Sequence, residues 1–194
     1  MKKVRRVFLS ASIPLPTRNA NYYATADVIG IRDAIRALVM VIAQTRAELV
    51  FGGHPAITPM VRLQMAQTQS RVRGRIVLFQ SRYFVDVLPE DNAAFERVVL
   101  VNAVEGNRDR SLELMRKEML RGKFSCGIFV GGMEGVQDEF KMFKQMHAKV
   151  PAYPIASTGA AAASLFEQEP DICRAHPELR SELSYLTLMR QLVG

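Results

Sequence analysis

The apolar residues of this chain alternate between two spacings, and this alternation limits the folds that the chain can adopt. Short runs of β-branched and aromatic residues predict six strands, at residues 4–9, 48–51, 75–79, 97–101, 124–130 and 152–155. Longer segments between them, at residues 26–46, 110–121 and 134–150, carry apolar residues three or four positions apart, which is the spacing of one helical face. Strands that alternate with helices in this way favour a mostly parallel sheet with both faces covered. The sequence therefore predicts an α/β, Rossmann-like fold.

The same pattern indicates how the chain is divided. No repeat or linker-like tract interrupts it, so we expect a single domain over residues 1–194. From about residue 165 the strand signal stops and helical spacing continues at residues 179–192, which predicts a C-terminal helical extension over about 165–194. Hydrophobic residues make up 48% of the chain, which excludes a disordered chain. No apolar run reaches the roughly 18 residues of a membrane span, so we expect no membrane partner.

Charge and cysteine content narrow the possible partners. The chain has 26 Lys and Arg against 19 Asp and Glu, a net charge of +7, which favours an anionic partner. The basic residues gather at 2–6, 71–75 and 116–123 without interleaved aromatic residues, and this disfavours a nucleic acid. Cys126 and Cys173 make no disulfide framework, which favours a cytoplasmic location. No spacing of His and Cys residues predicts a metal site, and we expect no cofactor.

Small and polar residues gather at the ends of four of the predicted strands. They are Ser10 and Ser12 after the first strand, Gly52, Gly53 and His54 after the second, Gly131, Gly132, Glu134 and Gly135 after the fifth, and Ser157 and Thr158 after the sixth. Ligands of open parallel sheets bind outside the carboxyl ends of the strands. Glycine lets the backbone approach an anion, and a helix N-terminus offers free N–H groups to a phosphate. One Gly-Gly pair also fits an ordinary tight turn, but two pairs between a strand and a helix favour a ligand site.

Other features refine the type of ligand site. A Walker A loop is absent, and so is GxGxxG at the first turn, which disfavours an ordinary dinucleotide dehydrogenase. We expect His54 to act as a neutral hydrogen-bonding group rather than as a general base. Residues 15–25 predict an irregular segment beside the pocket, in which Arg18, Tyr22 and Tyr23 could cover the ligand, with the tyrosine rings against a base. Packing of these rings on the protein itself is the alternative.

The segments at residues 51–61, 115–119 and 131–139 together resemble the SLOG superfamily. Residues 115–119, MRKEM, precede a strand and then GGMEGVQDE at residues 131–139. This arrangement is similar to the LOG pattern, an Arg-Lys pair on a helix followed by PGGxGTxxE. FGGHPAITPMV, at residues 51–61, is similar to the first glycine-rich loop of the sensing branch. The superfamily joins LOG-type nucleotide phosphoribohydrolases to ligand-sensing domains of TRPM channels and bacterial defence proteins, and the resemblance extends from residue 5 to about residue 164.

The resemblance also implies which residues would be catalytic. In LOG enzymes the helix arginine and the glutamate that ends the motif carry out hydrolysis, and they correspond here to Arg116 and Glu139. The family proline and threonine are both replaced by valine, and one extra residue stands between the second and third glycines. The extra residue makes Asp138 a rival for the role of Glu139. Both Arg116 and Glu139 also fit ordinary helix positions, stabilised by neighbouring charges or the helix dipole.

Three functions follow from the resemblance, and they stay open at this point. The first is a sensor that binds a nucleotide or ADP-ribose-like signal in bacterial signalling or anti-phage defence. The second is a phosphoribohydrolase that releases the base from a nucleoside 5′-monophosphate. The third, suggested by a DNA-processing branch of the superfamily, is nucleic-acid binding. A homo-oligomer is expected because related proteins commonly dimerise.

Overall fold

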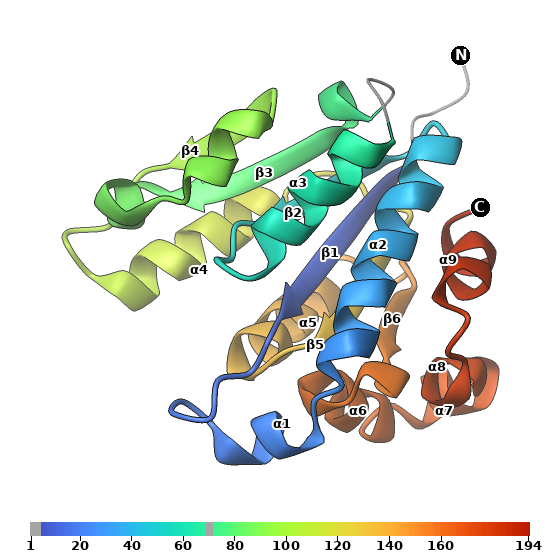
Figure 1. The fold of residues 1–194 in the computed structure, drawn as a ribbon. Coiled ribbons are helices and arrows are strands. Elements are labelled where there is room, and N and C mark those ends of the chain that lie inside the picture. Colours follow the sequence, from blue (N-terminus) through green and yellow to red (C-terminus); the bar gives the residue numbers. More distant parts are fainter. Residues whose placement is uncertain (1–4, 69–71) are drawn as a thin grey trace.

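The sheet of this protein is parallel throughout. The computed structural model describes residues 5–68 and 72–194, and its six strands lie in the order β4-β3-β2-β1-β5-β6 (Figure 1). The strands are Arg6–Ser12 (β1), Glu48–Gly52 (β2), Ile76–Ser81 (β3), Arg97–Val101 (β4), Cys126–Gly131 (β5) and Ala152–Ile155 (β6). Every neighbouring pair runs in the same direction. The predicted α/β, Rossmann-like fold is therefore confirmed.

Helices cover both faces of the sheet (Figure 1). The longer helices are Val28–Gln44 (α2), Ile57–Gln67 (α3), Arg108–Met119 (α4), Glu134–Met146 (α5), Ala160–Glu167 (α6) and Tyr185–Val193 (α9). The shorter ones are Ala20–Thr25 (α1), Pro170–Ala175 (α7) and Glu178–Ser181 (α8), with 3-10 turns at Arg73–Arg75 (η2), Arg82–Val87 (η3), Glu90–Ala94 (η4) and Ala156–Thr158 (η5). Within the described ranges, no helix has the length and apolar character needed to cross a membrane.

The core consists of two apolar layers, one on each side of the sheet. Along β1, Val7 and Leu9 pack on the side of α2, whereas Phe8 between them packs on the side of α5. Successive side chains of a strand point to opposite faces, so a strand buried on both faces is a continuous apolar run. On the α5 side, Phe8 stacks on Phe143 with ring centroids 5.6 Å apart. These layers explain why the predicted strands contain so few polar residues.

The boundaries of several elements differ from the prediction. β1 continues to Ser12, so Ser10 and Ser12 belong to the strand rather than to the turn after it. The helical pattern at residues 179–192 splits into α8 and α9, and α9 packs on α2. Leu188 and Met189 of α9 are fully buried there. Val4, with which the first strand was expected to begin, lies outside the described residues, as do parts of the basic clusters at 2–6 and 71–75.

The strand order places a crevice at a defined point of the sheet. From β1 the chain moves outward through β2 and β3 to β4, and then crosses back to β5 on the other side of β1. The connections therefore leave β1 and β5 in opposite directions at their carboxyl ends. A ligand site is expected at such a reversal, because the diverging loops leave a crevice there.

Candidate functional site

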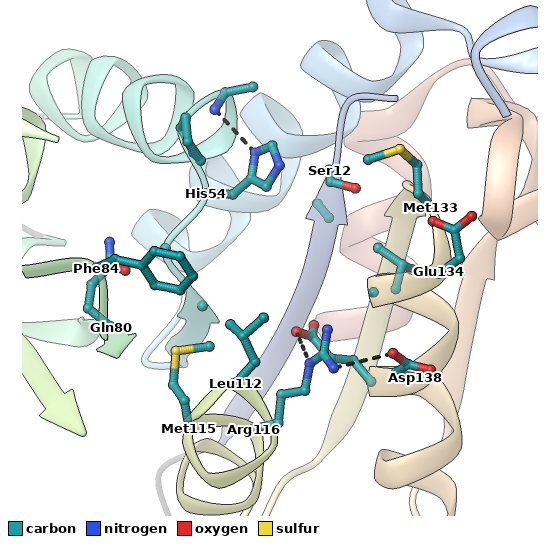
Figure 2. Close-up of a pocket in the computed structure, with 18 of the residues that line it drawn as sticks. Ser12, His54, Gln80, Phe84, Leu112, Met115, Arg116, Met133, Glu134 and Asp138 are labelled. Atoms are coloured by element: carbon teal, nitrogen blue, oxygen red, sulfur yellow. Dashed lines mark hydrogen bonds and ion pairs between the residues drawn. The ribbon is translucent and has the colours of Figure 1, made fainter. Parts of the chain in front are cut away.

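A cavity of about 650 Å³ lies at the carboxyl ends of β1, β2 and β3, between α4 and the N-terminus of α5. Figure 2 shows Gln80 and Phe84 on its β3 side and Glu134 and Asp138 on its α5 side, with Arg116 between them. This volume lies within the usual range of small-molecule sites. The cavity thus occupies the crevice that the strand order predicts.

The structure brings most of the predicted site residues to this cavity. Those that line it are Ser12, Gly52, Gly53, His54, Arg116, Glu134, Gly135 and Glu139. The others, which lie outside its lining, are Ser10, Gly131, Gly132, Ser157 and Thr158. Thr158 has a different contact, since its hydroxyl accepts a hydrogen bond from the Gly131 N–H at 2.8 Å and donates to the Ile155 carbonyl at 2.6 Å. These hydrogen bonds of Thr158 stabilise the turn after β5.

The turn after β5 is shaped by two glycines with left-handed backbone. Gly131 has a φ of 54° and Gly132 a φ of 89°, values that side-chain-bearing residues rarely adopt. The chain then enters α5 at Glu134, and the N-cap residue, Met133, makes no side-chain cap. The first N–H groups of an uncapped helix remain available to an anion, which the helix dipole also attracts. Met133, Glu134 and Gly135 all line the cavity.

The segment before α2 reaches the α5 end of the cavity. Asn19 caps α1 with its side chain and also donates to the Glu134 carboxylate at 2.6 Å. This contact ties the Glu134 side chain to α1. Arg18 lines the cavity as predicted, but Tyr22 and Tyr23 do not. Tyr22 instead packs against the core on the α5 side of the sheet, which is the alternative that the sequence left open.

The turn after β2 presents His54 to the cavity (Figure 2). The His54 Nδ1 accepts a hydrogen bond from the Ala56 N–H at 3.2 Å, so the neutral ring carries its proton on Nε2. Burial, and then the charge of Arg18, lower the pKa of His54 below its ordinary value. At neutral pH the ring is therefore an uncharged donor, which fits the hydrogen-bonding role expected for it.

Arg116 of α4 contacts both acidic residues that compete for the hydrolytic role. Its Nε lies 3.3 Å from Glu139 Oε1, and its Nη1 lies 3.3 Å from Asp138 Oδ2. The two carboxylates differ in exposure, because 15% of the Glu139 side chain is accessible against 55% of Asp138. Burial raises the pKa of Glu139, and the Arg116 guanidinium lowers it in part. Glu139 is therefore the partner whose chemistry the protein environment alters.

Sequence reasoning missed several residues of the cavity, and two of them are Gln80 and Phe84. Gln80 is the last residue but one of the buried strand β3, and Phe84 follows in η3; both line the cavity. The sequence contained a signal for Gln80, because this glutamine directly follows the apolar run at residues 76–79. Phe84 carried no such signal, since an aromatic residue after a strand is ordinary. A buried amide in an apolar strand is the feature to look for.

Both basic and acidic side chains line the cavity. Arg18, Arg108 and Arg116 line it together with four carboxylates, those of Asp109, Glu134, Asp138 and Glu139. No cluster of three or more His, Cys, Asp or Glu side chains suited to a metal ion occurs in residues 5–68 and 72–194. The arrangement can hold an anionic group at the N-terminus of α5 and a polar, uncharged group near His54 and Gln80.

A solved structure shares the fold of this chain, and a family model matches its sequence. The X-ray structure of TM1055, a structural genomics target, superposes with a TM-score of 0.53 and 13% sequence identity, over 84% of this chain and 81% of that chain. None of the curated proteins compared with the chain matches it. A model of the SLOG cluster3 family matches residues 21–193, so the match includes the C-terminal helices, which the resemblance ending near residue 164 left out. The chain therefore belongs to the SLOG cluster3 family.

Proposed function

We propose that this protein binds a nucleotide or an ADP-ribose-like ligand in the cavity at the carboxyl ends of β1, β2 and β3. The observation that carries the proposal is the uncapped N-terminus of α5, which opens into the cavity beside the largely buried Arg116. A helix N-terminus and a guanidinium together recognise a phosphate, through backbone N–H groups and through charge-assisted hydrogen bonds. Membership of the SLOG cluster3 family supports the same conclusion.

The distribution of side chains supports one orientation of the ligand. The phosphate would lie at residues 133–135, where the helix N–H groups are available. The ribose would lie near Arg116 and Glu139, which can bond to its hydroxyl groups. The base would reach the opposite end, at β3. The net charge of +7 would draw such an anion towards the protein without selecting it.

Binding itself is the first test. Wild-type protein is heated with each of a panel of nucleoside 5′-monophosphates, NAD and ADP-ribose, and unfolding is followed by calorimetry. A ligand present at a hundredfold excess over its dissociation constant adds about 2.7 kcal/mol of stability. We expect at least one member of the panel to do so, and to lose the effect in Arg116→Met. Arg180→Met, which removes an exposed arginine of α8 paired with Glu167, is the matched control and keeps the effect. A panel without any stabilising ligand would refute the proposal.

Hydrolysis of the ligand is the second candidate function, and the Arg116–Glu139 pair favours it. In this reaction the bond between C1′ and the base nitrogen breaks, the base leaves with the electron pair and takes up a proton, and water adds its oxygen to C1′. A carboxylate such as that of Glu139 stabilises the positive charge that develops at C1′ and accepts the proton of the water. Free base would then accumulate with the wild type but not with Glu139→Gln. Asp171→Asn, which changes an exposed carboxylate of α7 outside the cavity lining, is the control that retains turnover.

We propose that the principal function is that of a sensor, which binds the ligand without hydrolysing it. Stabilisation by the ligand without release of the base is the result expected for it. Its role would be in bacterial signalling or anti-phage defence, where the bound state changes how the protein associates with itself or with an effector. Light scattering with and without the stabilising ligand measures self-association directly, and a mass that stays that of one chain in both samples would refute self-association driven by the ligand.

A further inference from the structure

The β3 end of the cavity contains a buried amide whose hydrogen bonds are incomplete. Gln80 is 5% exposed and lines the cavity near the carboxyl end of β3. Its Nε2 donates to Asn92 Oδ1 at 3.4 Å, which is long for a hydrogen bond, and no further bond of its side chain occurs within the described residues. The Asn92 Nδ2 is also buried without a partner. Gln80 and Asn92 therefore keep hydrogen-bond donors and acceptors without a partner among the described residues.

Incomplete hydrogen bonding of a buried amide is unfavourable unless a ligand completes it. A glutamine side chain has two N–H donors and a carbonyl oxygen that accepts twice. Leaving such groups unbonded in a site shielded from water is unfavourable. Because Gln80 faces a cavity, the missing partner is a group that enters the cavity rather than one that the fold supplies.

The side chains around this amide are apolar, and one of them is an aromatic ring. The other side chains at this end belong to Phe84, Val87, Leu88 and Pro89, and Figure 2 shows the Phe84 ring beside Gln80. Tyr83 packs edge-on against Phe84, with ring centroids 4.9 Å apart. On the other side, Gly53 leaves room for the amide, because a Cβ there would overlap the Gln80 carboxamide. The amide and the ring are thus held next to each other.

We infer that Gln80 and Phe84 form a subsite that selects the nucleobase of the ligand. The face of the base would contact Phe84, and a base edge that carries a donor beside an acceptor would pair with the Gln80 carboxamide. An aliphatic group would leave Gln80 unbonded, and a sugar has no flat face for the ring. A planar heterocycle satisfies both residues. The inference rests on the proposed nucleotide-binding function and adds the residues that distinguish one base from another.

The test compares bases on a common sugar phosphate. AMP, GMP, CMP, UMP and ribose 5-phosphate are titrated into the wild type by isothermal calorimetry. We expect one base to be preferred over the others by about tenfold or more, the usual discrimination of a two-bond contact. In Gln80→Leu this preference should shrink to about twofold, with the affinity for ribose 5-phosphate unchanged. Phe84→Ala should weaken all four nucleotides and leave ribose 5-phosphate unaffected.

A matched control is available in the second buried glutamine. Gln64 of α3 is 5% exposed, accepts a long hydrogen bond from Arg36 at 3.4 Å, and lies outside the cavity lining. Gln64→Leu therefore repeats the loss of a buried amide and should keep the wild-type order of bases. If Gln80→Leu does not fold, Gln80→Glu keeps the shape of the side chain but can only accept when ionised, and it must change the order of bases.

The outcomes separate this inference from the proposed function. A wild type that binds neither the nucleotides nor ribose 5-phosphate, and that NAD and ADP-ribose also fail to stabilise, contradicts the proposed function itself. A wild type that binds nucleotides no more tightly than ribose 5-phosphate, or a Gln80→Leu variant that keeps the wild-type preference, overturns the base subsite alone. In that second case the phosphate and ribose contacts still support a nucleotide-type ligand.

Discussion

The turns after β2 and β5 share a Gly-Gly pair, but different physical constraints require glycine in them. In the β5 turn, both Gly131 and Gly132 have positive φ, and the chain enters α5 two residues later. Neither glycine of the β2 turn has positive φ. There, Gly53 is needed because the Gln80 side chain packs against its Cα.

The same Gly-Gly pattern thus meets a requirement of the backbone in the β5 turn and makes room for a side chain in the β2 turn. The β5 turn aims the N-terminus of α5 at the cavity, so a side chain there disturbs the fold first. The β2 turn leaves room for a cavity residue, so a side chain there disturbs ligand contacts first. Substitutions in the two turns should therefore separate stability from binding.

The largest effect is expected for Gly131→Val. Valine would hold a left-handed φ of 54°, and its Cβ would overlap the Ile31 side chain of α2, which is fully buried. Backbone strain and overpacking each cost about 1–3 kcal/mol, so we expect the free energy of unfolding to fall by about 3 kcal/mol or more. Urea denaturation followed by circular dichroism measures it. A loss below about 1 kcal/mol would show that the two turns do not differ in this way.

Gly53→Ala should give the opposite result. The new methyl group displaces the Gln80 carboxamide, which can move into the cavity, so we expect the free energy of unfolding to change by less than about 1 kcal/mol. Affinity for the preferred nucleotide should fall about tenfold, because the pairing of the amide with the base is lost. Calorimetric titration checks the affinity. Unchanged binding would mean that the β2 turn does not position a ligand contact.

The helix that follows the β5 turn, α5, carries a largely buried carboxylate at Glu139, and Glu139→Gln tests the effect of its charge on stability. The raised pKa of Glu139 means that the folded protein binds its proton more tightly than the unfolded chain does. Its contribution is present below the ordinary glutamate pKa of about 4.3 and is lost as the pH rises through the raised value. Relative to Glu139→Gln, the wild type should lose about 1.4 kcal/mol for each unit of elevation. Parallel stability profiles from pH 4 upward would contradict this.

The smallest effect is expected for Gly52→Ala. A Cβ at Gly52 would lie 3.5 Å from Met115 Cε and 3.6 Å from Met119 Sδ, which is ordinary van der Waals contact. Alanine also reduces the conformational freedom of the unfolded chain, so the change in stability should stay within about 1 kcal/mol and can be favourable. Denaturation next to Gly131→Val makes the comparison. A large loss here would show that both turns need glycine for the same reason.

Most of the fold was predictable because it depends on local spacing. The strands at Arg97–Val101 and Ala152–Ile155 have the predicted bounds, and the other four are shifted by a few residues. Part of the site was predictable for the same reason, since parallel strands all end at one edge of the sheet. The residues predicted after β6 do not line the cavity, because the edge is wider than the cavity. β6 lies two strands away from β1, so Thr158 stabilises the β5 turn and does not line the cavity.

The alternation of strands and helices, the glycine-rich turns and the helix arginine can be predicted from the sequence, because they depend on residues close together in the chain. The contact between Arg116 and Glu139 of another helix, and that between Gln80 and Gly53, arise from the three-dimensional fold. Those contacts follow from the strand order, which places β3 beside β2 and β5 beside β1. Strand order depends on how whole layers pack against each other, and no local pattern records it.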